Sequence, residues 1–192
     1  DICEQRIKRS SGLVRAILIN SGQANACTGD LGTQHFLIAT EKISELLGIK
    51  KEEVLMCSTG VIGVPIEINN LVKNLPKLVS ELKVNSFQNA AEAILTTDLT
   101  LKKVVIESSI EGRKIRIAAL AKGSGMIYPN MATMLAFLTC DAGVEKKEWD
   151  KMISIAVKKS FNAISVDGET STNDSFIGIN AGKKIKKEFL PI

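Results

Sequence analysis

The sequence predicts an α/β fold in which helices and mixed β-sheets form a layered sandwich. Residues 102–110 and 113–120 alternate strongly between apolar and polar side chains around Glu111 and Gly112, a pattern typical of a β-hairpin. Residues 14–20 form a nearly continuous apolar run, which is typical of a strand covered on both faces. A hairpin beside such a strand, with helical segments between, favours mixed sheets over an all-parallel Rossmann sheet.

The first half of the chain alternates between strand and helix patterns. The predicted elements are strands at 14–20 and 53–58 and helices at 33–47, 65–82 and 86–95. Gly48 is placed to end the first of these helices, because glycine readily adopts the left-handed conformation of a helix C-terminus. Thr59 and Gly60 are predicted to form a turn after the second strand. Pro65 begins the second helical region, which the pattern allows in one piece or two.

The second half continues the same alternation. After the hairpin, a glycine-rich loop leads into a strand predicted at 133–139. Residues 145–161 carry apolar side chains at helical spacing and predict an amphipathic helix, and a short strand follows at 176–180. A chain of 192 residues with this pattern suits one domain or a compact two-layer unit.

Composition excludes several classes of partner. Hydrophobic residues make up 45% and charged residues 24% of the chain, as in ordinary globular proteins. The net charge is +4, but lysines are scattered among acidic residues, and the basic run at 183–187 is interpreted as a solvated turn. Aromatic residues at 4% leave few stacking surfaces for nucleic acid, and no apolar run reaches transmembrane length. We therefore expect neither a nucleic-acid nor a membrane partner.

The cysteines and the single histidine predict no metal site. The four cysteines lie far apart without a Cys-x-x-Cys pair, so neither a zinc site nor a disulfide scaffold is expected. Cys57 and Cys140 lie in apolar runs and are interpreted as reduced core residues. His35 lies near the start of a predicted helix and is expected on the surface. A Ser-His-Asp arrangement is therefore disfavoured.

Residues 121–135 carry the most chemistry. A loop rich in glycine and containing Pro129 leads directly into the predicted strand that begins at Thr133. A hydroxyl fixed by a strand beside a bent loop is a candidate nucleophile. The alternative is a turn threonine that hydrogen-bonds locally.

Four blocks of sequence resemble one known family in the same order. Residues 122–135 resemble the self-cleavage signature of the ornithine acetyltransferase family, also called the glutamate N-acetyltransferase or ArgJ family. Residues 20–29, 58–63 and 167–174 resemble three further blocks of that family. The resemblance extends over essentially the whole chain, which looks like the central part of a family member. It implies a layered α/β fold of the DmpA/ArgJ type.

The resemblance implies a self-processed threonine enzyme. Cleavage between Ala132 and Thr133 would leave residues 1–132 as part of an α chain and residues 133–192 as the start of a β chain. Thr133 would then be the nucleophile, with its own α-amino group as the base.

The resemblance also implies an oxyanion hole. By resemblance, the Thr59 hydroxyl and the Gly60 amide stabilise the oxyanion. By itself, Ser-Thr-Gly is a common turn.

Substrate-binding residues are implied by the same resemblance. They are Thr96, Lys122 and Thr133, and Lys122 would pair with a substrate α-carboxylate from a loop that lines the site. Thr97 is the alternative to Thr96, because Leu99 stands where the family usually has a further threonine in this block. Without the resemblance, Lys122 would be a solvated loop lysine and both threonines part of a helix C-terminal turn.

The acidic loop at 167–174 has two interpretations. Asp167, Glu169 and Asp174 together could bind a hard cation, but their spacing does not match a calcium loop, and such loops usually hydrogen-bond their own backbone. We expect no metal, and Asn173 and Asp174 are candidates for shaping the pocket. Residues 20–29 are expected to form a tight buried turn near the same site.

The predicted function is transfer of the acetyl group of N-acetylornithine to glutamate through acetyl-Thr133, in arginine biosynthesis. No cofactor is expected, although acetyl-CoA would be a substrate of a bifunctional member. The α and β chains would assemble as αβ units into a homo-oligomer, in the cytoplasm or, for a fungal member, in the mitochondrial matrix. The alternatives are a related self-processing amidohydrolase or aminopeptidase, and an inactive truncated fragment.

Overall fold

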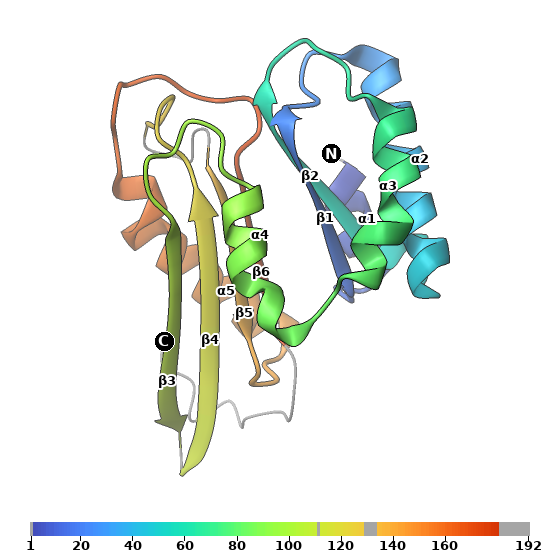
Figure 1. Ribbon diagram of the computed structural model, residues 1–192. Coiled ribbons are helices and arrows are strands. Elements are labelled where there is room, and N and C mark those ends of the chain that lie inside the picture. The colour runs from blue at the N-terminus through green and yellow to red at the C-terminus, as the bar shows by residue number, and fades with distance from the viewer. Residues whose placement is uncertain (1, 111, 129–133, 181–192) are drawn as a thin grey trace. The chain divides into compact units, whose positions relative to one another are not determined.

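A computed structural model describes residues 2–110, 112–128 and 134–180 (Figure 1). The chain divides between Thr96 and Thr97 into an N-terminal unit and a C-terminal unit. The N-terminal unit contains a two-stranded sheet and the C-terminal unit a four-stranded sheet. The prediction of an α/β fold with mixed sheets is therefore confirmed.

The N-terminal unit is built on a β-α-β motif. Strands β1 and β2 pair in parallel, and helix α2 connects them. The elements in order are α1 (Ile2–Arg9), β1 (Ala16–Gln23), α2 (Gly29–Leu47), the 3-10 turn η1 (Lys51–Glu53), β2 (Val54–Val61), α3 (Ile68–Ser80), the 3-10 turn η2 (Val84–Ser86) and α4 (Phe87–Ala93).

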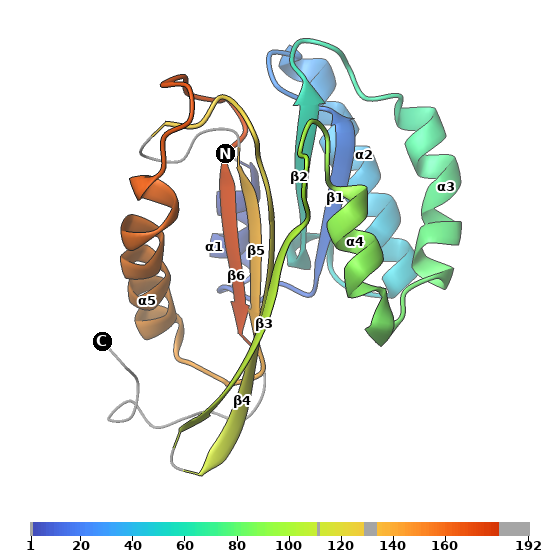
Figure 2. The ribbon, with the colours of Figure 1, turned by 60° about the vertical axis from the view of Figure 1, so that its left-hand side comes forward.

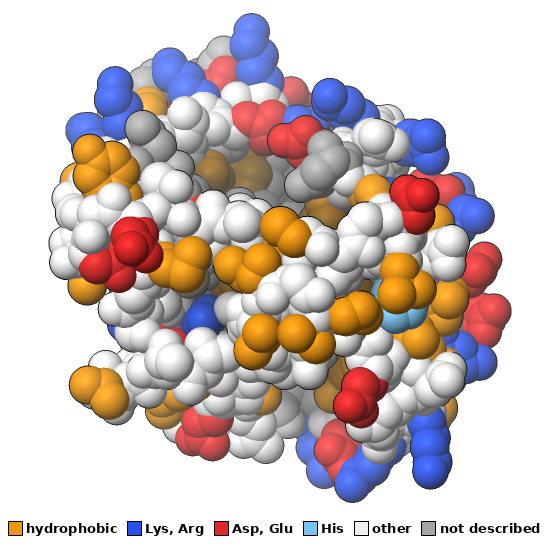
Figure 3. Space-filling model, turned by 90° about the horizontal axis from the view of Figure 1, so that it is seen from above, with side chains coloured by type: hydrophobic (Ala, Val, Ile, Leu, Met, Phe, Trp, Pro, Cys, Tyr) orange, Lys and Arg blue, Asp and Glu red, His pale blue; other side chains and the backbone are white. Residues whose placement is uncertain are grey.

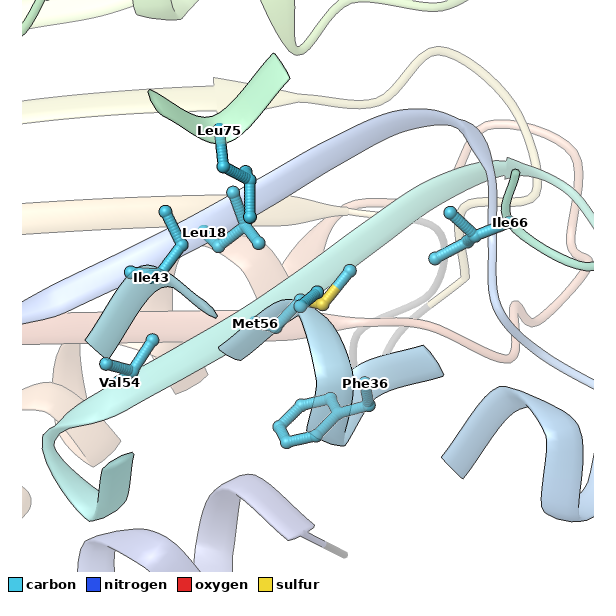
Figure 4. Close-up of a cluster of buried hydrophobic side chains, with 8 residues drawn as sticks. Leu18, Phe36, Ile43, Val54, Met56, Ile66 and Leu75 are labelled. Atoms are coloured by element: carbon cyan, nitrogen blue, oxygen red, sulfur yellow. The ribbon is translucent and has the colours of Figure 1, made fainter. Parts of the chain in front are cut away.

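The core of this unit lies between the strands and helices α2 and α3 (Figure 4). Val54 of β2 and Leu75 of α3 are almost completely buried, and Phe36 and Ile43 of α2 pack into the same cluster. Helix α2 ends where predicted, because Gly48 adopts the left-handed conformation with φ of 63°.

One feature of the helices differs from the predictions, and one alternative that the sequence left open is decided. His35 is buried, not on the surface, because it lies on the face of α2 that also carries Phe36 and Ala39. Helix α3 is one continuous piece that runs through Pro76, whose ring removes a single backbone donor.

Helix α1 has no counterpart among the predicted elements. Its Arg6 side chain is buried and donates a hydrogen bond to the Val54 carbonyl oxygen at 2.8 Å. The same guanidinium lies 4.8 Å from the ring centroid of Phe36, a cation-π contact. Tertiary contacts of this kind stabilise a short helix that has little intrinsic stability.

The C-terminal unit is a four-stranded mixed sheet with the order β3-β4-β5-β6. The first two pairings are antiparallel and the third is parallel. Helix α5 runs along one face of the sheet (Figure 2). The elements are β3 (Lys102–Ile110), β4 (Arg113–Lys122), β5 (Leu135–Cys140), α5 (Lys146–Lys159), the 3-10 turn η3 (Phe161–Ala163) and β6 (Ser175–Asn180).

The predicted hairpin is confirmed, with Ile110 opposite Arg113 across the turn. Helix α5 is held against β6 by the Trp149 indole, which donates a hydrogen bond to the Gly178 carbonyl oxygen at 2.9 Å. An apolar cavity of about 400 Å³ is lined mainly by residues of the four strands, with Ala156 of α5 and Phe161. Cys57 and Cys140 are both buried and outside any disulfide, as predicted.

The helices and the surface charges of the described part of the chain bear on the expectations about membranes and polyanions. No helix there is long and apolar enough to cross a membrane. On the face shown in Figure 3, basic side chains are interspersed with acidic ones. The basic run at 183–187 lies outside the described residues.

Candidate functional site

In the N-terminal unit, the candidate oxyanion residues lie at the carboxyl end of β2. The predicted turn at Thr59 and Gly60 is wrong, because β2 continues through both residues to Val61. The strand continues because β1 also continues, with Ser21 opposite Thr59 and Gly22 opposite Gly60. Thr59 is buried, whereas Gly60 is exposed.

Only glycine fits at position 60. Its φ is +129°, and a Cβ atom there would lie 2.3 Å from both the carbonyl carbon and the oxygen of Gly22. The two strands therefore approach closely where the carboxyl ends of a parallel pair meet, an edge where α/β proteins often bind ligands. This packing fixes the direction of the Gly60 amide.

The connection after β1 lies beside this strand end. Its backbone is held by bonds from Ala24 N–H to the Val61 oxygen and from Gly63 N–H to the Ala26 oxygen, both 2.9 Å. Asn25 and Cys27 have positive φ, 52° and 57°, which is strained for residues other than glycine. The expectation of a tight buried turn over 20–29 is only partly met, because the first residues continue β1 and Cys27 is exposed.

Thr96 and Thr97 follow helix α4, and both are exposed. Thr96 is the last residue of the N-terminal unit. The Thr97 hydroxyl lies 2.6 Å from that of Ser124, in the loop after β4. Thr97, the alternative to Thr96, is therefore in contact with the loop that follows Lys122.

Lys122 is the last residue of β4, not part of a loop, and only 3% of its surface is exposed. The strand extends this far because Lys122 pairs with Leu135 at the start of β5. Burial lowers the pKa of the Lys122 ammonium, and the negative charge of Asp98 opposes that shift. Lys122 is therefore a buried amine near the carboxylate of Asp98.

Asp98 is the functional candidate that the sequence predictions missed. Its side chain is fully buried, and its Oδ1 accepts hydrogen bonds from Lys102 Nζ at 2.6 Å and from the Gly123 N–H at 2.7 Å. Its Oδ2 is buried without a hydrogen-bond partner among the described residues. Its place directly after Thr96 and Thr97 in a block shared with the family was the available signal.

The charge of Asp98 is stabilised despite its burial. Burial favours the neutral carboxyl and by itself raises the pKa. The hydrogen bonds from Lys102 and Gly123, together with the charge of Lys122, outweigh burial and lower the pKa of Asp98. Asp98 therefore connects β3, the end of β4 and the following loop through an ionised carboxylate.

Asp167 and Asp174 bind backbone amides on both sides of the 129–133 segment. Asp167 accepts hydrogen bonds from Met126 and Ile127, and Asp174 accepts one from Met134. No group of three His, Cys, Asp or Glu side chains suited to a metal occurs in 2–110, 112–128 or 134–180. Of the three carboxylates that suggested a cation site, Asp167 and Asp174 thus accept hydrogen bonds from backbone amides.

The predicted cleavage site, Ala132 and Thr133, lies outside the described residues. The start of the strand predicted at 133–139 lies there too, and β5 is described from Leu135. The other candidates are divided between the units: Thr59, Gly60 and Thr96 belong to the N-terminal unit, and Lys122 belongs to the C-terminal unit.

Comparison with known proteins identifies a single family. The ArgJ family matches residues 1–190. The arginine biosynthesis bifunctional protein ArgJ of Prochlorococcus marinus subsp. pastoris is 80% identical over 190 residues, which is 99% of this chain and 47% of that protein. The protein of the same name from Parasynechococcus marenigrum is 52% identical, with 95% of this chain and 44% of that protein covered. The chain thus spans about half the length of these relatives.

Solved structures of the same family resemble this fold. The crystal structure of ArgJ from Bacillus halodurans matches with a TM-score of 0.62 and 32% identity, covering 68% of each chain. Ornithine acetyltransferase from Mycobacterium tuberculosis, crystallised in complex with ornithine, matches with a TM-score of 0.56 and 28% identity. That match covers 67% of this chain and 68% of the other.

Proposed function

The chain belongs to the ArgJ family, and on that premise we propose that it is part of an acetyltransferase of arginine biosynthesis. The observation that carries the proposal is the family match over residues 1–190, with a relative of 80% identity named for arginine biosynthesis. The proposed reaction moves the acetyl group of N-acetylornithine to glutamate.

The proposed nucleophile is generated by self-cleavage. The Thr133 hydroxyl attacks the Ala132 carbonyl carbon, the peptide nitrogen leaves as the threonine amine, and water hydrolyses the resulting ester. The freed α-amino group of Thr133 then serves as the base, which a weak hydroxyl nucleophile requires. His35 is buried in the core-facing side of α2, so it offers no evident alternative base.

Acetyl transfer then follows in two halves. The Thr133 oxygen attacks the acetyl carbonyl of N-acetylornithine, ornithine leaves with a proton on its nitrogen, and an acetyl ester remains on the enzyme. The glutamate amine attacks that ester, which gives N-acetylglutamate and restores the hydroxyl. Such ping-pong chemistry needs one site that accepts two amino-acid substrates in turn.

Thr59 and Gly60 are proposed to stabilise the oxyanion of both halves. The rigid backbone at Gly60, set by its contact with Gly22, supports a preorganised amide donor. One such donor contributes about 3–4 kcal/mol to lowering the barrier.

Lys122, with Thr96, is proposed to bind the substrate. The buried ammonium of Lys122 would pair with an α-carboxylate more strongly than a solvated lysine, because the local dielectric constant is low. The ornithine complex of the Mycobacterium tuberculosis relative agrees with an amino-acid ligand.

Three further points belong to this proposal. Acetyl-CoA would serve as a second acetyl donor, as the word bifunctional in the relatives' names suggests, and no resident cofactor or metal is needed. The α and β chains are proposed to form αβ units of a cytoplasmic homo-oligomer. In a related amidohydrolase, water would replace glutamate as the acceptor.

Intact-mass measurement of the purified chain tests the proposal most directly. We expect the parent to convert into peptides 1–132 and 133–192, and a Thr133→Ala variant to remain whole. An assay of acetyl transfer from N-acetylornithine to glutamate then separates a transferase from a hydrolase, which would release acetate. A parent that stays uncut and inactive would favour the alternative of an inactive fragment.

A further inference from the structure

The backbone just before the 129–133 segment is anchored by the loop that begins at Asp167. Asp167 Oδ2 accepts a hydrogen bond from the Met126 N–H at 2.6 Å, and Oδ1 accepts one from the Ile127 N–H at 3.0 Å. The Val166 N–H donates to the Ile127 carbonyl oxygen at 2.8 Å. The N–H and the C=O of Ile127 are therefore both hydrogen-bonded, the first to Asp167 and the second to Val166.

The backbone just after the segment is anchored by the other end of the same loop. Asp174 Oδ1 accepts a hydrogen bond from the Met134 N–H at 2.6 Å. The Ser175 N–H donates to the Met134 carbonyl oxygen at 3.0 Å. The arrangement repeats the one at Ile127, with a carboxylate on the amide and a neighbouring backbone N–H on the carbonyl.

We propose that Asp167 and Asp174 are positioning residues for cleavage between Ala132 and Thr133, holding the two ends of the segment that contains this bond. The proposal rests on the proposed function, because it assigns a role in the self-cleavage step. Intramolecular attack on a peptide bond depends on the approach of oxygen to carbon, and a misplacement of about 1 Å costs about 100-fold in rate.

Asp174 is the anchor closer to the bond. It binds the N–H of Met134, which is the first described residue after the segment. Asp167 binds the backbone at Ile127, which lies five residues before Ala132, so it fixes only the point where the segment begins. Removal of Asp174 should therefore slow cleavage more than removal of Asp167.

The pKa values of the two carboxyl groups shift in opposite directions. The hydrogen bond from Met126 is the largest cause that lowers the pKa of Asp167, so this exposed carboxylate remains an anionic acceptor. Burial raises the pKa of Asp174, although the bond from Met134 opposes the shift. Asp174 is thus partly shielded from water beside the backbone that it holds.

The first experiment follows cleavage by intact mass in the full 192-residue chain. We expect Asp174→Ala to cleave about 100-fold more slowly than the parent and Asp167→Ala about 10-fold more slowly. Glu169→Ala removes an exposed carboxylate from the same loop and should cleave within about twofold of the parent. Asp174→Asn keeps an acceptor oxygen and should restore cleavage to within about tenfold of the parent.

The second experiment measures amide hydrogen exchange in the uncleaved Thr133→Ala background, so it does not depend on cleavage. Asp174→Ala should speed exchange at Met134 about tenfold or more, while Met126 and Ile127 change little; Asp167→Ala should give the reverse pattern. Exchange along β4 and β5 reports whether each variant keeps its fold.

The outcomes separate the two proposals. A parent that is not cleaved overturns the proposed function for this chain, and exchange then decides alone whether the carboxylates anchor the backbone. Unchanged exchange at Met134 in Asp174→Ala overturns the anchor. Faster exchange with cleavage at the parental rate overturns the positioning role. Slow cleavage in Asp174→Ala with recovery in Asp174→Asn supports it.

Discussion

At the scale of single residues, Gly60 shows how a local constraint fixes a candidate catalytic amide. A side chain at this position would collide with the backbone of Gly22, and the backbone itself has positive φ. Gly63, two residues after the strand ends, also has positive φ but has open space around it. Gly60 and Gly63 are therefore a matched pair: both have positive φ, but only at Gly60 would an added side chain collide with its surroundings.

We predict that Gly60→Ala destabilises the N-terminal unit by about 3 kcal/mol, because it adds a collision to a strained conformation. Gly63→Ala should cost only about 1 kcal/mol. Urea unfolding, monitored by circular dichroism, measures the loss of stability in both variants. The single tryptophan, Trp149, lies in the C-terminal unit, so its fluorescence reports on that unit separately. Equal effects of the two substitutions would contradict the steric argument.

Asp98 predicts a dependence of stability on pH. The folded-state pKa of this carboxyl is below its ordinary value of 3.8, so its contribution is complete above that pH and is lost as the pH falls through the folded-state pKa. We expect Asp98→Asn to reduce the stability of the C-terminal unit by about 1–2 kcal/mol at pH 7. The difference from the parent should shrink below pH 3.8.

Urea titrations monitored by Trp149 fluorescence at several pH values measure this difference. Asp150→Asn is the control, because Asp150 pairs with Lys146 on the surface of α5 and should contribute less than about 0.5 kcal/mol. If the difference in unfolding free energy between the parent and Asp98→Asn stays constant from neutral pH to strong acid, the ionised carboxylate is not its cause.

At the scale of elements, strand β3 is an exposed edge of the C-terminal sheet. Among the described strands it pairs only with β4, and Val104, Val105 and Ile106 are each about half exposed. Since neighbouring residues of a strand face opposite sides, both faces of this edge are apolar. Proteins usually protect such edges with charge, because an open edge can pair with a second chain.

We predict that the purified chain self-associates through β3 and that Val105→Lys weakens the association. Ser108→Lys adds the same charge to an exposed polar position of the same strand and should have a smaller effect. Light scattering after size-exclusion chromatography, over a range of concentrations, gives the mass of each variant. A parent that remains monomeric at every concentration would contradict the prediction.

At the scale of the whole molecule, patterns that depend on neighbours in sequence were predictable. The hairpin follows from strict alternation, and the end of α2 follows from the left-handed preference of Gly48. Features that depend on distant contacts were not. Helix α1 is stabilised through Arg6 by Val54 and Phe36, and the extension of β2 through Gly60 depends on its pairing with Gly22.

The candidate site follows the same division. Motifs made Thr59, Gly60 and Lys122 candidates, but their structural settings required pairing information. Thr59 and Gly60 lie at a strand end instead of in a turn, and Lys122 is buried in a strand instead of a loop. The burial of His35 was within reach of the sequence, because its spacing from Phe36 and Ala39 places it on the apolar face of α2. Asp98 was missed because its partners Lys102 and Gly123 come together only when β3 and β4 pair.

The antiparallel pairing of β4 with β5 has a consequence for a processed molecule. Six residue pairs join Ile117–Lys122 to Leu135–Cys140, and the proposed cut falls between these two strands in sequence. A cut there would turn contacts within one chain into contacts between two polypeptides. The stability of this unit would then depend on protein concentration, as it does for any complex of separate subunits.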